Sequence, residues 1–426
     1  MPRPFLYHVW DDPAFNGLAP LSPASVPVIP IGGGAPVPRQ MYSLKRDLIE
    51  MRRIGVQKGI VDASWLKAGD SAGGRELWGI KVGTGSSHKV VVVGCHHARE
   101  WISLELAYYI AEYLINKHPG NSAPANDKEK RIKHLLLNRQ IWFVPLVNPD
   151  GHAITIATER DWRQNNASHT VPAGSVVRPA GRVSWPPGTY TGVDINRNYA
   201  TTAAASPGGH GTFLAWGAET FSGGIVRTSR DPRDSAITRQ VWCGPGAASE
   251  NETAAIQALV AGARAAISFH SFACQWLWPG PLSPPHRSDL PYVDWVGDGT
   301  VAIMGTAGGG ARSYTYTGGP NPYLTSGDMA DFTYQATGFR PSYTPEVRPK
   351  RDGPTPDPSA WEFSGLPEAQ IEPCFRENLA ASLAVINCAG HNAQSTTVPL
   401  ATNTGNPPQR CQYVRKCWEV FRGWTP

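Results

Sequence analysis

The chain has 426 residues and carries 39 lysines and arginines against 34 aspartates and glutamates, which gives a formal net charge of +5. Its 41% apolar content and 15 tryptophans can build a large core, which excludes wholesale disorder and a small scaffold held by disulfides alone. No stretch reaches the roughly 18 to 20 uninterrupted apolar residues of a membrane helix, and the basic residues form no block, so neither a membrane nor a nucleic acid is expected as a partner.

The first segment, residues 1–40, holds nine prolines, a composition that disfavours helix and predicts an N-terminal extension. A helix is expected after it, with Ser43 as its N-cap and with Leu44, Leu48 and Met51 on one face. The hydrophobic pattern then predicts strands over 76–82, 89–95, 140–147 and 265–270, and helices over 102–117, 249–263 and 372–389.

The predicted strands are apolar without a period-two alternation, and amphipathic helices separate them. This order predicts an α/β fold with a mixed, mostly parallel twisted sheet that is covered by helices on both faces. We expect a single domain over residues 41–390, followed by a polar C-terminal tail over 391–426. Two long Gly- and Pro-rich stretches inside the domain, 164–190 and 201–244, are expected to be loops that form walls or lids.

The seven cysteines are an odd number, so at least one must stay unpaired within the chain. Cys95 is the expected free thiol, because it ends an apolar strand. The candidates for at least one bridge that would tether the tail are Cys374, Cys388, Cys411 and Cys417. The first 30 residues contain no apolar segment of about 7 to 15 residues, as a secretory signal requires, which leaves the localisation open.

A histidine and a glutamate three residues apart follow the predicted strand 89–95. His97 and Glu100 therefore lie at the carboxyl end of a strand, where open α/β sheets bind their ligands. An imidazole and a carboxylate at this spacing can reach one cation, and a distant third ligand would complete an open catalytic zinc site. His270, at the end of the strand 265–270, is the candidate third ligand. Each signal alone is weak, because the spacing often arises by chance and a strand-end histidine is more often a hydrogen-bonded core residue.

Two other residues bear on this site. His96 has an arginine rather than a glutamate three residues later, so it is expected to lie beside the metal ligands rather than among them. Glu346 lies in the β-like segment 342–348, where an acidic side chain among apolar neighbours is costly unless it has a function. It is the candidate general base. Pro345, directly before it, is expected to end the strand or to introduce a bulge.

Five short segments resemble, in order, the signature segments of the zinc metallocarboxypeptidases of the pancreatic A/B type. They are His97-Ala-Arg-Glu100-Trp, Asn148-Pro-Asp-Gly151, Trp162-Arg163, Asp194-Ile-Asn-Arg197-Asn198 and Phe269-His270-Ser. Segments 323–334 and 344–348 continue the similarity, which covers residues 41–389. Several independent motifs in the right order are far more specific than any one of them. The resemblance implies a carboxypeptidase-like fold with a single catalytic domain.

The resemblance also implies a function, a zinc-dependent carboxypeptidase that hydrolyses the C-terminal peptide bond of peptides and proteins. His97, Glu100 and His270 would bind one Zn²⁺ per chain and leave a position for water. Glu346 would take the proton of that water and pass it to the leaving amine. Arg163 would stabilise the carbonyl oxygen as it gains negative charge.

Further matching residues would bind the end of the substrate. Asn196 and Arg197 would clamp the C-terminal carboxylate, since a planar guanidinium fits a carboxylate bidentately. Tyr323 would close over the bound end, and Arg99 and Arg160 would help to steer the carboxylate. The substrates would be peptides or proteins with a free C-terminal carboxylate, and the enzyme is expected to act as a monomer.

In this family one segment determines which C-terminal residue is removed. Matching 331–334 to the usual end of that segment places Ala330 at the main determinant, where A-type enzymes have a bulky apolar residue and B-type enzymes an aspartate. Ala330 fits neither type. Asp328 either points a carboxylate into the same pocket, where it would attract Lys or Arg, or faces solvent at the loop edge. Broad specificity is expected, with acidic ends cleaved worst.

Three other functions compete with this one. The segment Gly69-Asp-Ser-Ala-Gly73 matches a serine-hydrolase elbow, but the strand-like stretch 76–82 follows it instead of a helix, which predicts a turn between strands. A zinc amidase or deacylase, acting on cell-wall peptides or N-acyl amino acids, would use the same metal chemistry. A non-catalytic binding scaffold would be expected to lose ligands or the base, whereas every role here has a chemically competent residue.

Overall fold

The structure is a computed structural model. It describes residues 41–61, 67–85, 88–171, 188–204, 213–218, 240–272, 274–277, 279, 315–317, 325–338, 340–347 and 371–389. The two predicted terminal segments, 1–40 and 391–426, lie outside this part of the chain. Of the helices described, none is both long and apolar enough to span a membrane.

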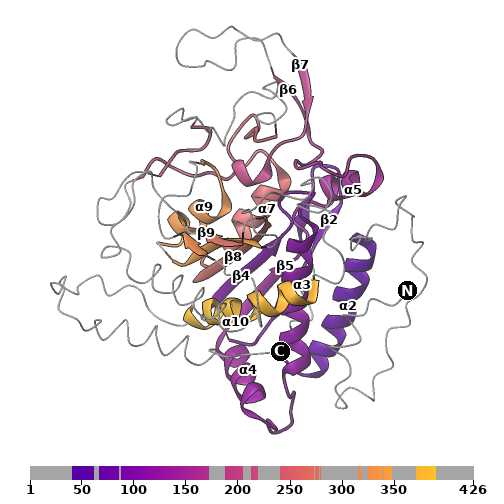
Figure 1. Cartoon of the computed structure of the whole chain (residues 1–426), viewed down its shortest axis with the longest axis vertical. Helices are drawn as coiled ribbons and strands as arrows, with labels where there is room; N and C mark the ends of the chain where they lie inside the picture. Colours follow the sequence, from indigo (N-terminus) through magenta and orange to yellow (C-terminus); the bar gives the residue numbers. More distant parts are fainter. Residues whose placement is uncertain are drawn as a thin grey trace, which may run out of the picture.

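A mixed sheet forms the centre of the molecule (Figure 1). In the described residues it has seven strands, in the order β10-β9-β11-β8-β4-β5-β3. The strands are β3 (Ile80–Val82), β4 (Lys89–Gly94), β5 (Gln140–Val144), β8 (Ala265–Ser271), β9 (Gln275–Leu277), β10 (Thr315–Thr317) and β11 (Ser342–Val347). Four of the six neighbouring pairs are parallel, and the pairs β9/β11 and β3/β5 are antiparallel. The predicted mixed, mostly parallel sheet is confirmed.

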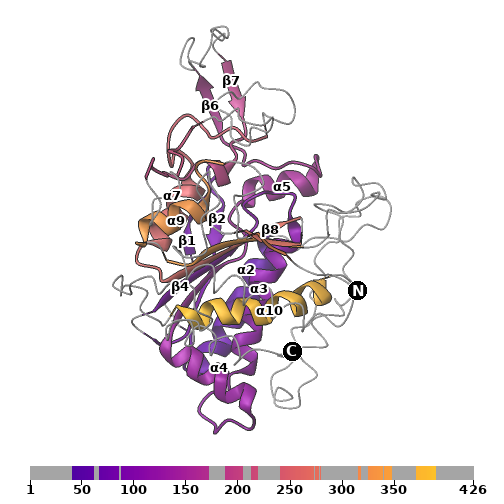
Figure 2. The same cartoon turned by 60° about the vertical axis from the view of Figure 1, so that its left-hand side comes forward.

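Helices cover both faces of this sheet, as predicted. One face carries α2 (Met41–Gln57), α3 (Trp101–Lys117) and α10 (Ile371–Cys388), and the other carries α7 (Asn251–Val260) and α9 (Met329–Ala336). Figure 2 shows α3 and α10 on one side of the sheet and α7 and α9 on the other. Along β4, Val90 and Val92 pack into the core with α3, whereas Val91 and Val93 pack into the core with α7. A strand buried on both faces therefore has a continuous apolar sequence.

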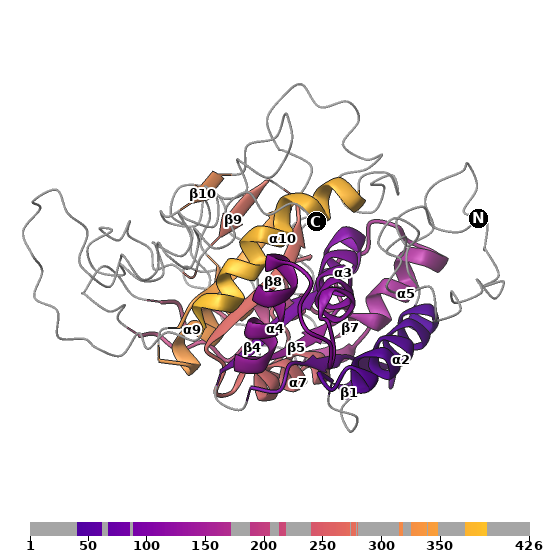
Figure 3. The same cartoon turned by 90° about the horizontal axis from the view of Figure 1, so that it is seen from below.

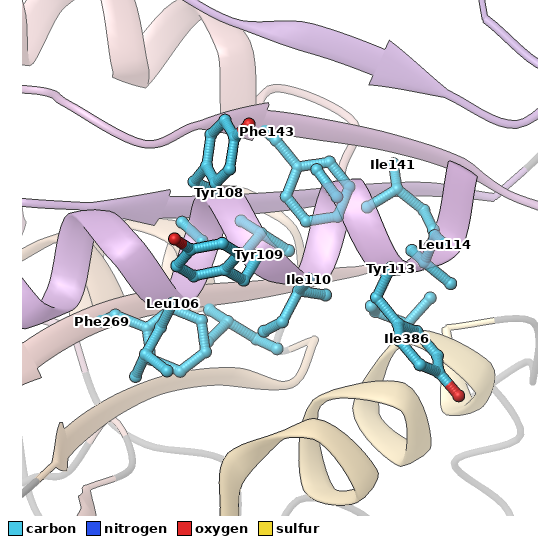
Figure 4. Close-up of a cluster of buried hydrophobic side chains, with 14 of the residues drawn as sticks. Leu106, Tyr108, Tyr109, Ile110, Tyr113, Leu114, Ile141, Phe143, Phe269 and Ile386 are labelled. Atoms are coloured by element: carbon cyan, nitrogen blue, oxygen red, sulfur yellow. The ribbon is translucent and has the colours of Figure 1, made fainter. Parts of the chain in front are cut away.

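Helix α3 is enclosed on nearly all sides. Figure 4 shows Leu106 of this helix beside Phe269 of the sheet, with Phe143 of the sheet and Ile386 of α10 in the same cluster. Each of these side chains is at most 1% exposed, and full burial of one such side chain stabilises the fold by about 1.5 to 3 kcal/mol. Figure 3 shows α2, α3 and α10 side by side across this face. Because the sheet and two helices surround it, α3 can be apolar around most of its circumference.

The remaining elements refine the predicted boundaries. They are α4 (Asp127–Asn138), α5 (Pro149–Ala157), the 3₁₀ helix η2 (Ile195–Arg197), β1 (Lys67–Asp70), β2 (Glu76–Trp78), β6 (Ser168–Val171) and β7 (Gly188–Thr191). The predicted strand 76–82 is two short strands in different sheets, because β2 pairs with β1 and β3 pairs with β5. Residues 71–75 connect the antiparallel strands β1 and β2, which confirms the predicted turn in place of a serine-hydrolase elbow. The first predicted loop, 164–190, contains the antiparallel pair β6/β7.

Strand β11 runs through Pro345, so the predicted strand end or bulge is wrong. Tyr343 lies opposite Ile267 of β8, and Glu346 lies opposite His270. The offset is the same on both sides of the proline, whereas a bulge would have shifted it by one residue. Proline lacks the N–H that a ladder bond needs, and β9 pairs with β11 at this position from the other side.

Two further expectations concern a helix end and the cysteines. Helix α2 begins at Met41, so Ser43 lies inside its first turn and is not its N-cap. Four cysteine side chains are described and buried, and of these Cys95 is free; the other three are Cys243, Cys274 and Cys374. The free thiol at Cys95 is confirmed, and the bridge considered for Cys374 stays a prediction. The side chain of Cys388 and the whole of Cys411 and Cys417 lie outside the described residues.

A buried carboxylate at the start of α7 gives the fold a pH dependence. The side chain of Glu252 is fully buried, and it accepts a hydrogen bond from the backbone N–H of Ala72 at 3.2 Å. Burial raises the pKa of Glu252 to about 7, and the charges of Glu250 and Asp150 add to this rise. Between its ordinary pKa of 4.5 and about 7, the folded chain therefore holds a proton that the unfolded chain has released. The free energy of unfolding must fall as the pH rises through this window, by roughly 3 kcal/mol for this group.

Glu252→Gln is therefore expected to stabilise the protein at high pH. Glutamine keeps the shape of the protonated carboxyl and cannot ionise, so the variant should match the wild type at pH 4.5 and exceed its free energy of unfolding by roughly 3 kcal/mol at pH 8. Urea unfolding of both proteins at several pH values measures this difference. Glu159→Gln is the control, because Glu159 is exposed. An equal difference between Glu252→Gln and wild type at both pH values would contradict the expectation.

Candidate metal centre

Three buried side chains converge at one end of the sheet. The Nδ1 atom of His97 lies 2.7 Å from Oε1 of Glu100, the Nδ1 atom of His270 lies 2.9 Å from Oε2 of Glu100, and the two Nδ1 atoms are 3.1 Å apart. Each of the three residues is at most 3% exposed. Within the described part of the chain, they form the only group of three or more such residues with donor atoms close enough for one metal ion.

The topology explains why residues far apart in sequence meet here. His97 and Glu100 follow β4, and His270 lies near the end of β8, which is the parallel neighbour of β4. From β4 the chain continues to β5 on one side of β4, whereas β8 lies on the other side. The carboxyl ends of β4 and β8 thus flank the point where the strand order reverses, the usual ligand site of an open α/β sheet.

The short turn after β4 brings the first two donors together. The backbone N–H of Glu100 donates to the carbonyl oxygen of His97 at 3.1 Å, so that the two side chains, three residues apart, face the same point. Glu100 is also the residue that precedes α3, the buried helix of the core. One donor is therefore attached directly to a rigid element.

The donor set fits a zinc ion. Two imidazoles and one carboxylate are the protein ligands of many catalytic zinc sites, and three ligands leave a position open. The Nε2 atom of His97 lies 3.2 Å from Oδ1 of Asp194. A carboxylate at that nitrogen accepts its proton and leaves the lone pair of Nδ1 directed at the cluster, as in metal sites where a carboxylate orients a histidine.

The charges of the cluster also match what a metal site needs. Burial alone would raise the pKa of Glu100, but its electrostatic interactions and hydrogen bonds with His97 and His270 hold it far below its usual range. Burial lowers the pKa of His270. The pKa of Glu100 thus favours its ionised form and that of His270 its neutral form, the forms in which these groups bind a cation.

Asp194 connects the cluster to the charged residues beside it. Its Oδ2 atom accepts from Nε of Arg163 at 2.9 Å, and its Oδ1 atom accepts from the backbone N–H of Asn196 at 3.0 Å. Burial would raise the pKa of Asp194, but the charges of Arg163, His97 and Arg197 hold it well below its usual value. Another nitrogen of Arg163, Nη1, lies 3.8 Å from Oε1 of Glu100.

Asn196 and Arg197 lie next to the same cluster. The Nδ2 atom of Asn196 is 3.3 Å from Nε2 of His270, and its Oδ1 accepts from the backbone N–H of Met329 at 3.0 Å. Arg197 is 4% exposed, and its Nη1 donates to the carbonyl oxygen of Asn196 at 2.6 Å. A guanidinium buried beside a metal cluster is an unusual arrangement that favours a bound anion.

Glu346 lies on β11, the strand next to that of His270. It lies opposite His270 in the parallel pair of β11 and β8. Residues that face each other across a sheet project from the same side of it, so the side chains of Glu346 and His270 leave the sheet on the same face. The proline before it therefore does not carry Glu346 away from the site.

The other predicted binding residues have different surroundings. Arg99 is held by the carbonyl oxygen of Asp161 and by Oε1 of Gln240, each 3.1 Å from its Nη1, and burial lowers its pKa to about 10. The guanidinium of Arg160 lies over the ring of Trp101, 5.4 Å from its centre. Tyr323 lies outside the described residues.

Asp328 is the N-cap of α9 rather than a solvent-facing residue. Its Oδ1 accepts from the backbone N–H of Asp331 and its Oδ2 from the hydroxyl of Thr325, each at 2.9 Å. It is 9% exposed, so the expectation that it faces solvent is wrong. Ala330 lies in the first turn of the same helix and is 4% exposed.

Four residues at the site had no predicted function. Asp194 orients His97 and Arg163, and its position at the head of the segment Asp194-Ile-Asn-Arg197 was the signal that could have marked it. Tyr199 and Ser268 carry no signal beyond a polar atom in an apolar stretch. His96 was expected to be a neighbour of the site, and the structure places both of its nitrogens in hydrogen bonds to these two residues.

The three buried donors lie at the switch point of a mostly parallel sheet, with an arginine beside them. This arrangement is typical of metal-dependent hydrolases. A sequence model of a family described as zinc carboxypeptidase matches residues 62–381, about three quarters of the chain. The chain belongs to the zinc carboxypeptidase family.

Individual relatives agree with this membership. Carboxypeptidase O of Homo sapiens is 26% identical over 309 residues, which cover 71% of this chain and 67% of the relative. Carboxypeptidase B of Astacus astacus is 27% identical over 335 residues, which cover 76% of this chain and 89% of the relative. The solved structure of carboxypeptidase A from Helicoverpa armigera superposes with a TM-score of 0.59 at 19% identity, covering 84% of this chain and 75% of the other. This last similarity shows the fold.

The family confirms the predicted class of enzyme. The protein is a metallocarboxypeptidase, a hydrolase with zinc as its cofactor and peptides as its substrates. The carboxypeptidase-like α/β fold is confirmed by the structural neighbours. The amidase and deacylase alternatives have less support.

Proposed function

We propose that this carboxypeptidase holds one zinc ion between His97, Glu100 and His270 and removes the last residue of peptides and proteins with a free C-terminal carboxylate. The observation that carries the proposal is a buried arginine, Arg197, joined through Asn196 to the buried three-donor cluster. A zinc ion bound in an open site lowers the pKa of bound water towards neutrality and polarises a carbonyl oxygen. The enzyme acts as a monomer, without a nucleic acid or a membrane as partner.

Glu346 is the general base of the proposed mechanism. Its position opposite His270 directs its carboxylate to the face of the sheet where the donors lie. There it accepts a proton from the attacking water as the oxygen bonds to the carbonyl carbon. The same proton then passes to the nitrogen of the leaving amine as the C–N bond breaks. One carboxylate thereby serves as base and then as acid.

Arg163 stabilises the charge that this step creates. Two of its nitrogens, Nε and Nη2, are each 2.9 Å from Oδ2 of Asp194, and this double contact fixes the plane of the guanidinium. The carbonyl oxygen of the substrate becomes negative as water adds to the carbonyl carbon. A fixed positive group beside that oxygen needs no reorganisation during the reaction, and such a contact accounts for about 3 to 4 kcal/mol of barrier reduction in comparable sites.

Asn196 and Arg197 bind the terminal carboxylate, and this makes the enzyme an exopeptidase. Arg197 supplies a bidentate charge partner for the carboxylate, whereas an internal peptide segment would leave that guanidinium buried without a substrate anion. Tyr323 closes over the bound end. Arg99 and Arg160 steer the approaching carboxylate.

Arg197→Ala is expected to lower kcat/KM for peptides with a free C-terminus by about 30- to 5000-fold, because loss of one partner from a buried charge pair costs about 2 to 5 kcal/mol. C-terminally amidated peptides should be poor substrates of the wild type, and the variant should cleave them no worse. Steady-state assays of both peptide forms measure the difference. Arg131→Ala is the control, since Arg131 is exposed on α4.

Two outcomes would count against the proposed clamp. Equal cleavage of free and amidated peptides by the wild type would indicate an endopeptidase. Faster hydrolysis of N-acyl amino acids or cell-wall peptides than of ordinary blocked dipeptides would indicate the amidase or deacylase, because those substrates can carry the same carboxylate on a different acyl group.

The specificity pocket is proposed to be broad and to prefer apolar ends. Ala330, at the position that the family uses for discrimination, has a small buried side chain and leaves room for large aromatic or aliphatic residues. Both carboxylate oxygens of Asp328 already accept hydrogen bonds, from Asp331 and Thr325. This favours capping of α9 over attraction of Lys or Arg as the main function of Asp328.

Asp328→Asn tests whether Asp328 mainly caps α9 or attracts Lys and Arg ends. Asparagine caps helices as well as aspartate does, so the variant should keep the start of α9 while it loses the charge. The ratio of kcat/KM for peptides ending in Arg to that for peptides ending in Phe is expected to stay within about threefold of the wild-type ratio. A tenfold or larger fall in this ratio, with unchanged cleavage of Phe and Leu ends, would instead assign the charge to the pocket.

A further inference from the structure

A row of hydrogen-bonded side chains leads from His270 away from the metal donors. The Nε2 atom of His270 lies 3.1 Å from Oγ of Ser268, and the same Oγ lies 3.1 Å from Nδ1 of His96. The Nε2 atom of His96 lies 2.7 Å from the hydroxyl of Tyr199. All four side chains are at most 2% exposed, so water does not compete for these contacts.

The fold itself holds these residues in a row. Ser268 and His270 are two residues apart on β8 and therefore project from the same face of the sheet. His96 follows the neighbouring strand β4, and its ring stacks on the ring of His270, with 5.5 Å between centres and 13° between planes. Tyr199 packs against Phe332 of α9, with 5.8 Å between ring centres.

The contacts at Nε2 of His270 determine which atoms carry the protons. When Nδ1 of His270 directs its lone pair at the metal, Nε2 must carry the ring proton and needs an acceptor. Asn196 does not provide one, because its Oδ1 accepts from the N–H of Met329 and the atom that faces the histidine, at 3.3 Å, is the donor Nδ2. Ser268 Oγ is therefore the acceptor.

The rest of the row follows from this first assignment. Ser268, having accepted from His270, donates its own hydroxyl proton to Nδ1 of His96. His96 then carries its proton on Nε2 and donates it to the hydroxyl oxygen of Tyr199. With Nδ1 of His270 directed at the metal, each contact of the row from His270 to Tyr199 pairs a donor with an acceptor. Reversal of any one of these three contacts would place two donors or two acceptors together.

We propose that Ser268, His96 and Tyr199 are positioning residues that hold His270 in its metal-binding tautomer and orientation. The inference rests on the proposed function of His270 as a zinc ligand. It assigns His96 a contribution to zinc affinity although His96 is not itself a ligand. The row ends at Tyr199, which packs against Phe332 of α9. Because α9 also carries Ala330, the row connects the helix of the proposed specificity pocket to one metal ligand.

Zinc affinity of purified variants, measured by competition with a chromophoric chelator, tests the proposal directly. Ser268→Ala and His96→Leu should each raise the zinc dissociation constant by about 10- to 100-fold, the usual effect of removing a group that orients a metal-binding histidine. Tyr199→Phe should raise it several-fold. Tyr109→Phe is the matched control, because it removes a hydroxyl from another buried tyrosine, one in the core around α3, and it should leave zinc affinity unchanged.

A conservative variant and a double variant separate positioning from simple packing. His96→Asn keeps an amide oxygen that can accept from Ser268, so it should retain zinc affinity within about threefold, whereas His96→Leu should not. In the Ser268→Ala/His96→Leu double variant the loss should be no larger than in Ser268→Ala alone, because the two residues act through one contact. The visible spectrum of the cobalt-substituted protein should shift in the same variants that lose affinity.

Different results would contradict the positioning proposal and the proposed zinc site. Wild-type zinc affinity and cobalt spectrum in Ser268→Ala and in Tyr199→Phe would overturn the proposal while leaving the zinc site intact. The proposal would also be overturned if the losses of zinc affinity were additive in the double variant. The same holds if His96→Asn bound zinc as weakly as His96→Leu, because the residues would then act only through packing. Absence of zinc binding by the wild type would overturn the proposed function itself. If His96→Leu does not fold, Tyr199→Phe and Ser268→Ala still decide the outcome.

Discussion

Glu346→Gln is expected to bind zinc within about threefold of the wild type and to hydrolyse peptides about 10²- to 10⁴-fold more slowly. Glutamine keeps the size of the side chain opposite His270 and removes the group that accepts and returns the proton. The substrate contacts of Arg163 and Arg197 remain, so KM should change little. Steady-state kinetics together with zinc analysis of the same preparation measure both quantities.

Two comparisons sharpen this experiment. Glu346→Asp keeps the charge but shortens the side chain, so a loss smaller than that of the Gln variant would show that the carboxylate acts chemically and that its position matters. Glu105→Gln, which changes a buried glutamate on α3, should retain wild-type turnover. Normal turnover in Glu346→Gln would mean that another group moves the proton.

Removal of zinc is expected to abolish activity and to lower the free energy of unfolding. The site is assembled only in the folded chain, so a ligand that binds it stabilises the protein by about 4 kcal/mol when free zinc exceeds the dissociation constant a thousandfold. Dialysis against a chelator should yield an inactive protein of lower melting temperature. One equivalent of zinc per chain should restore both properties, as followed by activity and calorimetry.

Single histidine variants test whether zinc acts through the three proposed donors. His270→Ala removes one of the three donors and should lose both activity and the zinc-dependent rise in melting temperature. His152→Ala is the matched control, because His152 is equally buried but lies against Trp101, away from the donors. A chelated protein that stays fully active, or a His270→Ala variant that still gains stability from zinc, would refute the metal centre.

Much of the central sheet and its helices could be predicted from hydrophobic patterns, because burial decides them. The run Val90–Val93 is apolar on both faces of a strand, and α3 is apolar around most of its surface, so both stand out in composition. Element ends were less predictable. Ser43 has the chemistry of an N-cap, but α2 begins two residues earlier, at Met41. Local preference at helix ends is worth about 1 kcal/mol, and tertiary packing can outweigh it.

Pro345 and Asp328 show a second limit of prediction from the sequence, which is that tertiary contacts decide the backbone path. A proline argues against a central strand, yet β11 continues because the N–H it lacks leaves only one ladder position without a bond. Asp328 could be placed in the specificity segment from the sequence, but whether its carboxylate faces a pocket, solvent or a helix end depends on backbone direction. Backbone direction is set by tertiary contacts that no local pattern contains.

The metal donors were predictable for a different reason. His97 and Glu100 are three residues apart, and one turn of chain brings them together, whereas His270 joins them only through the pairing of β4 with β8. That pairing is long-range, and a lone strand-end histidine does not reveal it. The order of several family motifs along the chain supplied this information. Asp194 shows what such motifs leave out, because its contacts with His97 and Arg163 became visible only in three dimensions.

The burial of α3 determines when the metal donors can separate during partial unfolding. Proteins open in cooperative units, and the units with the most buried apolar contacts open last and protect their amide hydrogens longest from exchange. Glu100 precedes α3, and the other donors are attached to β4 and β8, the strands against which that helix packs. Local fluctuations such as fraying of the peripheral β6/β7 ribbon can therefore occur while the donors stay together. The backbone amides of β4 and β8 should accordingly exchange their hydrogens only on the slow timescale of global unfolding.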